Sequence, residues 1–203
     1  MSTHPFGPWQ QLDSREVYDN PWIRVTHDTV IAPSGQPGIY GVVHFKNRAV
    51  GIVPIDAHGN VWLVRQFRYT LNAYSLEIPE GGSPLGEPLL TTAQRELQEE
   101  TGLIAADWQH LLDLHTSNSV TDESGALFLA RHLTEGVSTP EHTEDIEVVI
   151  LPLSTAIARI FQGDITDSLS VMGLLAAQHW LTTHGAAADL PHARFSDPRH
   201  PPA

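Results

Sequence analysis

The sequence of 203 residues contains no cysteine, has only one lysine, Lys46, and lacks any long apolar run. Without cysteine, neither a disulfide framework nor a thiolate metal site can form, which agrees with the reducing cytoplasm where we expect the protein. The longest apolar runs, such as VVILPL, have the length of a strand, and no stretch resembles a signal peptide or a membrane span. We therefore expect a soluble protein.

Basic residues are also scarce, and the formal net charge is −13. Such a surface repels nucleic acids and anionic membranes, so we expect neither as a partner. A small anionic substrate stays possible if metal ions and local arginines reverse the field in a cleft. The 12 histidines are scattered and form no HExxH motif, while the 41% of hydrophobic residues suffice for a core.

The length suits one domain with an additional N-terminal layer. We expect a flexible arm over residues 1–20, because no hydrophobic period is sustained there, and an N-terminal β-layer over 21–48. The main domain follows over 49–183. The last segment, 184–203, is rich in Ala, Pro, His and Arg and is predicted to be a disordered tail.

Strand-like and helical patterns alternate along the chain. A turn at residues 33–35 predicts a hairpin between 22–31 and 39–45, and a second pair of strands is predicted at 48–56 and 60–69. Further strands are expected at 73–79, 109–116, 125–132 and 145–152, and helices at 88–101, 153–162 and 167–183. This order of elements favours an α/β or α+β sandwich.

The segment over residues 81–103, GGSPLGEPLLTTAQRELQEETGL, predicts a short helix bracketed by glycines. Pro88 suits the first helical position, and Gly102 suits the position just after the helix end. An apolar stripe at helical spacing is expected to face a core and consists of Leu90, Ala93 and Leu97.

The same helix gathers carboxylates on another face. Glu96 and Glu100 are four residues apart and stack, with Glu99 beside them. Carboxylates crowded in this way repel one another unless solvent or a cation offsets their charge, and oxygen ligands of this kind suit Mg²⁺ or Mn²⁺. The alternative is a solvated acidic face, but it does not explain the flanking glycines. Gly81 and Gly82 let the backbone approach closely, so a carbonyl there is a further candidate ligand.

At these residues the segment resembles the Nudix box, G-x5-E-x7-R-E-U-x-E-E-x-G-U with U aliphatic. Leu97 and Leu103 occupy the aliphatic positions. The fixed positions are all matched, by Gly81, Glu87, Arg95, Glu96, Glu99, Glu100 and Gly102. The resemblance implies a Nudix-type α/β/α sandwich with a mixed sheet and an additional N-terminal antiparallel β-layer. It also implies hydrolysis of a nucleoside diphosphate linked to another moiety.

Roles carry over from the family position by position. Glu96 and Glu100 are then the main metal ligands, Glu99 is an auxiliary one, and the residue before the box, Glu80, donates its carbonyl. Two further residues brace the loop and the helix, Arg95 and Glu87.

The likeness extends over residues 20–183, and VRQFRY with LEIPEGG resembles the ADP-ribose and nucleotide-sugar pyrophosphatase branch. Its members dimerise through the N-terminal layer, so we expect a homodimer. Arg65 and Arg68 are then candidate phosphate ligands, and Glu77 contacts substrate or metal. The alternative for both arginines is a strand position facing water. Trp22 is a candidate for stacking on a base, with packing as its alternative.

One segment departs from the branch. ADP-ribose enzymes usually carry Ser-Pro-Gly where this chain has Ser117, Asn118 and Ser119. Selectivity for a GDP- or UDP-sugar is therefore an alternative to ADP-ribose.

The catalytic base is expected in the segment 140–148. By the resemblance, Glu144 matches an acidic loop residue that contacts the metals in this branch, so it is a candidate both for the base and for a metal ligand. Glu141 and His142 are alternatives for the base that can equally be exposed loop residues. The prediction is a pyrophosphohydrolase that uses Mg²⁺, with Mn²⁺ as an alternative, and with Glu144, Glu100 and Glu99 in catalysis. The products are a nucleoside monophosphate and a sugar phosphate. Two rivals are a non-catalytic Nudix-fold regulator and a structural metal-binding domain.

Overall fold

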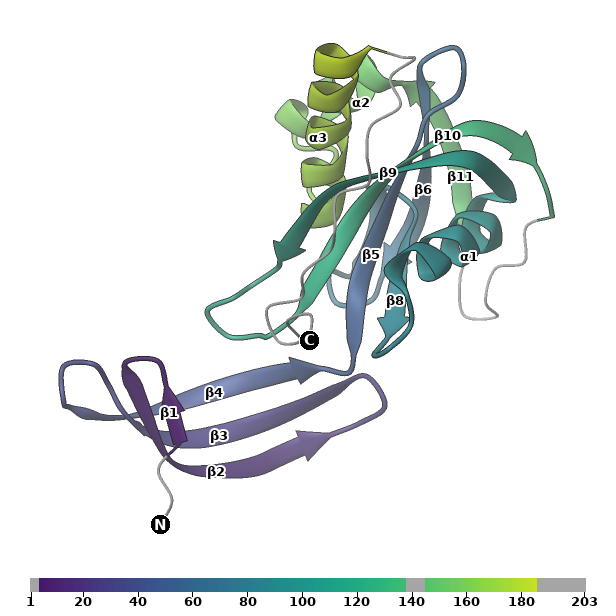
Figure 1. Cartoon of the computed structure of the whole chain (residues 1–203). Coiled ribbons are helices and arrows are strands. Elements are labelled where there is room, and N and C mark those ends of the chain that lie inside the picture. Colours follow the sequence, from purple (N-terminus) through teal and green to yellow (C-terminus); the bar gives the residue numbers. More distant parts are fainter. Residues whose placement is uncertain (1–3, 138–144, 186–203) are drawn as a thin grey trace. The chain divides into compact units, whose positions relative to one another are not determined.

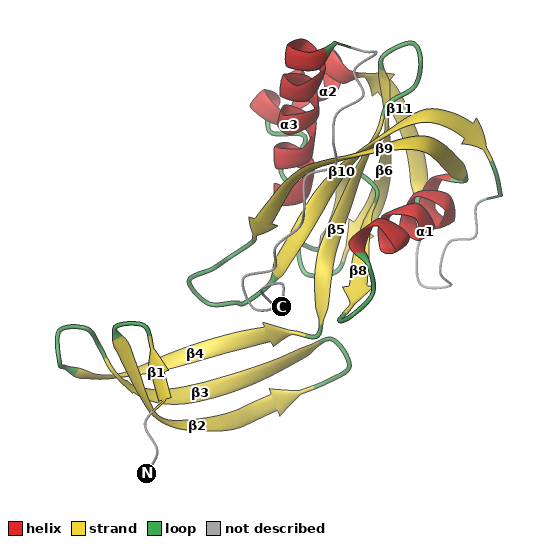
Figure 2. Ribbon diagram, viewed as in Figure 1, coloured by secondary structure: helices red, strands yellow, loops and turns green. Residues whose placement is uncertain are grey.

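The computed structural model describes residues 4–137 and 145–185, drawn in Figures 1 and 2. This part of the chain divides into two compact units. One contains residues 4–48 and the segment His115–Ser124, and the other contains the remaining described residues. No helix in the described ranges is long and apolar enough to cross a membrane.

The N-terminal unit is an antiparallel sheet with the strand order β1-β2-β3-β4. The hairpin predicted around residues 33–35 is confirmed as β3 and β4. Residues 1–20 were expected to be irregular, but β2 occupies most of them. Its side chains are mostly exposed and two register shifts interrupt it, so no alternating apolar pattern marks it. The strands are β1 His4–Phe6, β2 Trp9–Asp19, β3 Ile23–Ile31 and β4 Pro37–Phe45.

The segment His115–Ser124 joins this unit by pairing with β4. The backbone N–H of Val43 donates to the carbonyl of Val120 at 2.9 Å. Nearby, Nδ1 of His44 lies 2.7 Å from Oδ2 of Asp122. The connection in which we noted the Ser117-Asn118-Ser119 departure is therefore part of the N-terminal unit.

The second unit contains two sheets, ordered β8-β5-β10-β9 and β11-β6-β7. The first is mixed, since β5 and β10 run parallel. The second predicted pair of strands, 48–56 and 60–69, is confirmed as β5 and β6, but the two do not pair in one sheet. They lie in different sheets, and the turn between them carries an isolated bridge between Ile55 and Val61. An apolar run buried on both faces is typical of a strand inside a mixed sheet. The strands are β5 Asn47–Pro54, β6 Asn60–Arg68, β7 Ala73–Glu77, β8 Glu80–Pro84, β9 Leu103–His115, β10 Ser124–Glu135 and β11 Glu147–Pro152.

Helices cover both faces of the mixed sheet (Figure 2), namely α1 Leu89–Thr101, α2 Leu153–Gln162 and α3 Ser168–His184. Side chains alternate along β5, so Val50 and Ile52 pack with α1 while Val53 packs with α2 and α3. The result is a helix–sheet–helix sandwich. The predicted helices are confirmed to within a residue or two at either end.

Two details of α1 differ from the prediction. Pro88 is the cap residue and not the first helical residue. Leu89 takes the buried position that we assigned to Leu90, because Leu90 is 37% exposed whereas Leu89 is 7% exposed. The buried stripe thus follows a spacing of four residues, from Leu89 to Ala93 and Leu97. Gly102 ends the helix with φ of 73°, as a left-handed cap requires.

Candidate active site

The acidic face of α1 is offset by a single arginine. Nη2 of Arg95 lies 2.8 Å from Oε1 of Glu96, and Nη1 lies 2.7 Å from Oε2 of Glu99. Burial opposes the charged guanidinium, but the charges of the two glutamates together raise the pKa of Arg95 above its usual value. These contacts fix the two carboxylates against the helix.

Strand β8 brings its backbone against the same face. The N–H of Glu80 donates to Oε2 of Glu100 at 3.1 Å, and Glu100 is only 4% exposed. Gly81 lies so close to Glu96 that a Cβ atom there would be 2.1 Å from the carboxylate carbon. Three predicted metal residues, Glu80, Glu96 and Glu100, are therefore neighbours. Their oxygens are the donor type that a hard divalent cation prefers, so these residues fit such an ion.

A hydrogen bond braces the loop that leads into α1. Oγ1 of Thr92 donates to Oε1 of Glu87 at 3.0 Å, so the early glutamate of the motif is tied to the first turns of the helix. This contact leaves Glu87 out of the acidic face itself.

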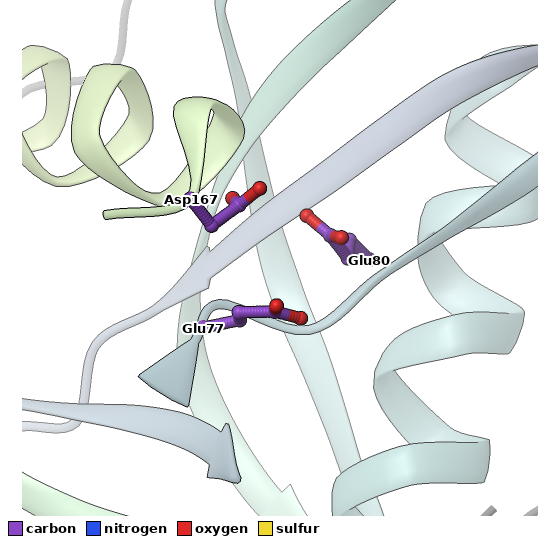
Figure 3. A group of neighbouring side chains, drawn as sticks. All are labelled: Glu77, Glu80 and Asp167. Carbon is purple, nitrogen blue, oxygen red and sulfur yellow. The ribbon is translucent and has the colours of Figure 1, made fainter. Parts of the chain in front are cut away.

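Arg68 lies among a second set of carboxylates. Its Nε and Nη2 donate to both oxygens of Glu77 at 2.5–3.0 Å, and Nη2 also contacts Oε1 of Glu80 at 2.5 Å. Glu77 is 2% exposed and accepts a further hydrogen bond from Gln66. Figure 3 shows Asp167 facing these two glutamates, and ligand oxygens of the three carboxylates all lie within 4.8 Å of one another.

The electrostatics of this second set are unbalanced. Burial, followed by the charges of Asp167 and Glu77, raises the pKa of Glu80 well above its usual value. The guanidinium of Arg68 is partly desolvated, yet its two glutamate partners raise its pKa. The pKa of Glu80 thus rises through burial and repulsion between carboxylates, and the pKa of Arg68 rises through the anions around it.

The two arginines predicted as phosphate ligands lie on opposite faces of β6, because side chains alternate along a strand. Arg68 shares its face with Glu77. Arg65 instead lies 3.1 Å from Glu147, with its guanidinium 4.0 Å from the centre of the Tyr74 ring. The structure therefore does not bring the two arginines together.

Other predicted residues lie elsewhere. Trp22 belongs to the N-terminal unit, where it is 66% exposed. Glu144, with its alternatives Glu141 and His142, lies outside the described residues.

Sequence reasoning missed Asp167. It caps α3, where its Oδ2 accepts a hydrogen bond from the N–H of Ser170 at 2.7 Å. An Asp before an apolar helical pattern predicts a cap, which was the available signal. No sequence pattern pairs that cap with glutamates some 90 residues earlier.

Residues 45–168 match the model of the NUDIX domain, and residues 9–43 match that of the nucleoside diphosphate sugar hydrolase N-terminal domain. The chain belongs to the Nudix family. It is thus a Nudix hydrolase, an enzyme that acts on phosphorus anhydrides, and a divalent metal is typical of this family.

Several characterised proteins are similar to this Nudix hydrolase. An ADP-ribose pyrophosphatase of Mycobacterium tuberculosis is 37% identical, with 90% of this chain and 87% of that protein covered. A methanol dehydrogenase activator of Bacillus methanolicus is 28% identical over 80% of this chain and 89% of its own. The crystal structure of an ADP compounds hydrolase superposes with a TM-score of 0.81 at 23% identity, covering 91% of this chain and all of that one, and it confirms the predicted fold.

Proposed function

We propose that this Nudix hydrolase cleaves the diphosphate of ADP-ribose or of a nucleoside diphosphate sugar, with Mg²⁺ as its metal and Mn²⁺ as a substitute. The products are a nucleoside monophosphate and a sugar phosphate. The observation that carries the proposal is the approach of β8 to α1, where the N–H of Glu80 bonds to Glu100 and Gly81 abuts Glu96. Similarity to ADP-ribose pyrophosphatases of two organisms supports the substrate class.

The residues at α1 have separable tasks. Glu96 and Glu100 hold the metal together with the carbonyl of Glu80, and Glu99 is an auxiliary ligand. A bound divalent ion supplies charge neutralisation for the diphosphate and a more acidic water. Arg95 keeps Glu96 and Glu99 in place through its ion pairs.

Substrate contacts come from outside α1. Arg68 is held by Glu77 and Glu80 on one face of β6, and its side chain is 35% exposed. We propose that its guanidinium binds phosphate oxygens of the substrate. Arg65 is a second candidate on the other face. For the base we propose Glu144, with Glu141 and His142 as alternatives.

A panel of diphosphate nucleotides tests the proposal. Purified protein with Mg²⁺ is expected to release nucleoside monophosphate from ADP-ribose or from a GDP- or UDP-sugar. The Ser117-Asn118-Ser119 departure makes GDP- and UDP-sugars the necessary comparison. The activity proposal fails if no member of the panel is cleaved with either Mg²⁺ or Mn²⁺.

The same panel separates catalysis from a regulatory role. One relative carries the name of an enzyme activator, so a non-catalytic regulator is the second candidate. A regulator binds nucleotide without releasing monophosphate. The box glutamates that hold metal in catalysis are all present, which favours the enzyme.

We also propose that two copies associate through the N-terminal unit, with Trp22 stacking on the base. The exposed tryptophan supports the second part. Sedimentation should give twice the chain mass of 22.3 kDa. A monomer at working concentration would refute the dimer, and an unchanged KM for Trp22→Ala would refute stacking.

A further inference from the structure

The carboxylates of Glu80 and Asp167 face one another on the side of Glu80 that is turned toward α3 and away from α1 (Figure 3). The backbone of Glu80 serves the glutamates of α1, whereas its side chain points into this second group. We propose that Glu80 and Asp167 bind a divalent cation through their side chains, at a site separate from that of the α1 glutamates.

Charge within the group is the first argument. Ligand oxygens of three carboxylates lie within 4.8 Å of one another, and Arg68 is the cation that contacts two of them, Glu77 and Glu80, among the described residues. Both oxygens of Glu77 are bonded to this guanidinium, and Oε1 of Glu80 shares it. One guanidinium therefore serves Glu77 and Oε1 of Glu80, and in the described part of the chain no second cation contacts the three carboxylates.

An orphaned oxygen is the second and independent argument. Oε2 of Glu80 exposes less than 1 Å² and accepts no hydrogen bond from any donor in the described ranges. Asp167 faces it, and an ionised carboxylate has no proton to donate. A buried polar atom without a partner is destabilising by about 1–3 kcal/mol, and more when it is charged, so the arrangement calls for a ligand.

The chemistry of the site selects a divalent cation. Mg²⁺ and Mn²⁺ bind hard carboxylate oxygens, and Mg²⁺ typically uses one or two carboxylates while keeping several waters. A pocket of about 420 Å³ adjoins the group and leaves room for such waters. Its walls carry hydroxyl groups that can hydrogen-bond to them, from Thr70, Ser75, Thr166 and Ser168.

Asp167 has one oxygen available for this task. Its Oδ2 accepts the capping hydrogen bond from Ser170. One of its carboxylate oxygens also lies within 4.8 Å of a carboxylate oxygen of Glu80, close enough for both to contact the same ion. The cap also makes a clean variant possible. Asn caps a helix as well as Asp does, so Asp167→Asn removes the charge and keeps α3.

Mn²⁺ binding to the full chain, measured without substrate by calorimetry and by electron paramagnetic resonance, tests the proposal. The wild type is expected to bind one Mn²⁺ more per chain than Asp167→Asn. Asp164→Asn is the matched control, because it changes the same charge at an exposed position three residues away, and it should bind as the wild type does. Glu80→Gln keeps the backbone carbonyl and should lose the same ion as Asp167→Asn.

A further variant separates the two sites. Glu96→Gln with Glu100→Gln should lose the ion at α1 and keep the one that Asp167→Asn removes. Equal stoichiometry in the wild type and Asp167→Asn, or an equal loss in Asp164→Asn, overturns the proposal. Since only Mn²⁺ is titrated, an inert substrate panel refutes the proposed activity and leaves this result standing.

Discussion

Two groups of carboxylates lie on either side of Glu80, and they are built differently. The group on α1 comes from a single stretch of helix and is offset locally by Arg95. The group formed by Glu77, Glu80 and Asp167 joins the ends of two strands and a helix cap around Arg68.

The difference concerns what holds each group together. Helix geometry alone places the α1 glutamates side by side. The second group depends on tertiary folding, which brings three separate elements to one guanidinium. Loss of one charge on α1 should therefore lower the catalytic rate and leave the folding stability nearly unchanged. Loss of a charge in the second group should lower the folding stability.

Glu100→Gln is expected to have the largest effect. Removing one metal-binding carboxylate should lower kcat roughly 10³-fold, within the range found when a charge-stabilising group is lost. The amide keeps an oxygen that can accept the hydrogen bond from Glu80, so the thermal midpoint should change little. Steady-state kinetics and circular dichroism measure both quantities. Turnover equal to that of the wild type would show that the metal assignment on α1 is wrong.

Arg68→Met should act mainly on stability. Without the guanidinium, Glu77 and Glu80 stay buried with no cation. Breaking a fully buried pair costs about 3–5 kcal/mol, and the partial exposure of Arg68 reduces our expectation to roughly 2–4 kcal/mol in the free energy of unfolding. Denaturant unfolding of metal-free protein measures it.

A second substitution checks the cause. Adding Glu80→Gln to Arg68→Met removes part of the uncompensated charge and should recover a portion of the lost stability. A double variant as unstable as the sum of both single variants would indicate that Arg68 acts through packing and not through charge.

The same contrast explains which features could be predicted from the sequence. The spacing of Glu96, Glu99 and Glu100 is a local property, so it predicted the acidic face, and the apolar period with Gly102 predicted the helix. Strand pairing is not local. The order of β5 and β6 in the chain indicated a hairpin, whereas the structure places them in separate sheets. Asp167 escaped prediction for the same reason, because its partners are set by the fold.

The pH dependence of stability should reveal the buried pair. The pKa of Glu80 is raised in the folded state above its usual 4.5, so the folded chain binds this proton more tightly than the unfolded chain does. The free energy of unfolding therefore falls as pH rises from about 4.5 toward the raised pKa. Metal-free wild type should lose more thermal stability over this window than Glu80→Gln, whose side chain cannot ionise. Parallel curves for the two proteins would contradict the shift.

Arg65→Ala is expected to have the smallest effect on stability and serves as the counterpart to Arg68. The side chain of Arg65 is 44% exposed and that of its partner Glu147 is 65% exposed, so water screens most of the attraction between them. Loss of this ion pair and of the contact with Tyr74 should change the free energy of unfolding by about 1 kcal/mol or less. Kinetics then decide the role of Arg65, because a phosphate contact requires a higher KM at unchanged stability. An unchanged KM would leave Arg68 as the phosphate ligand on β6, on the face that carries the buried carboxylates.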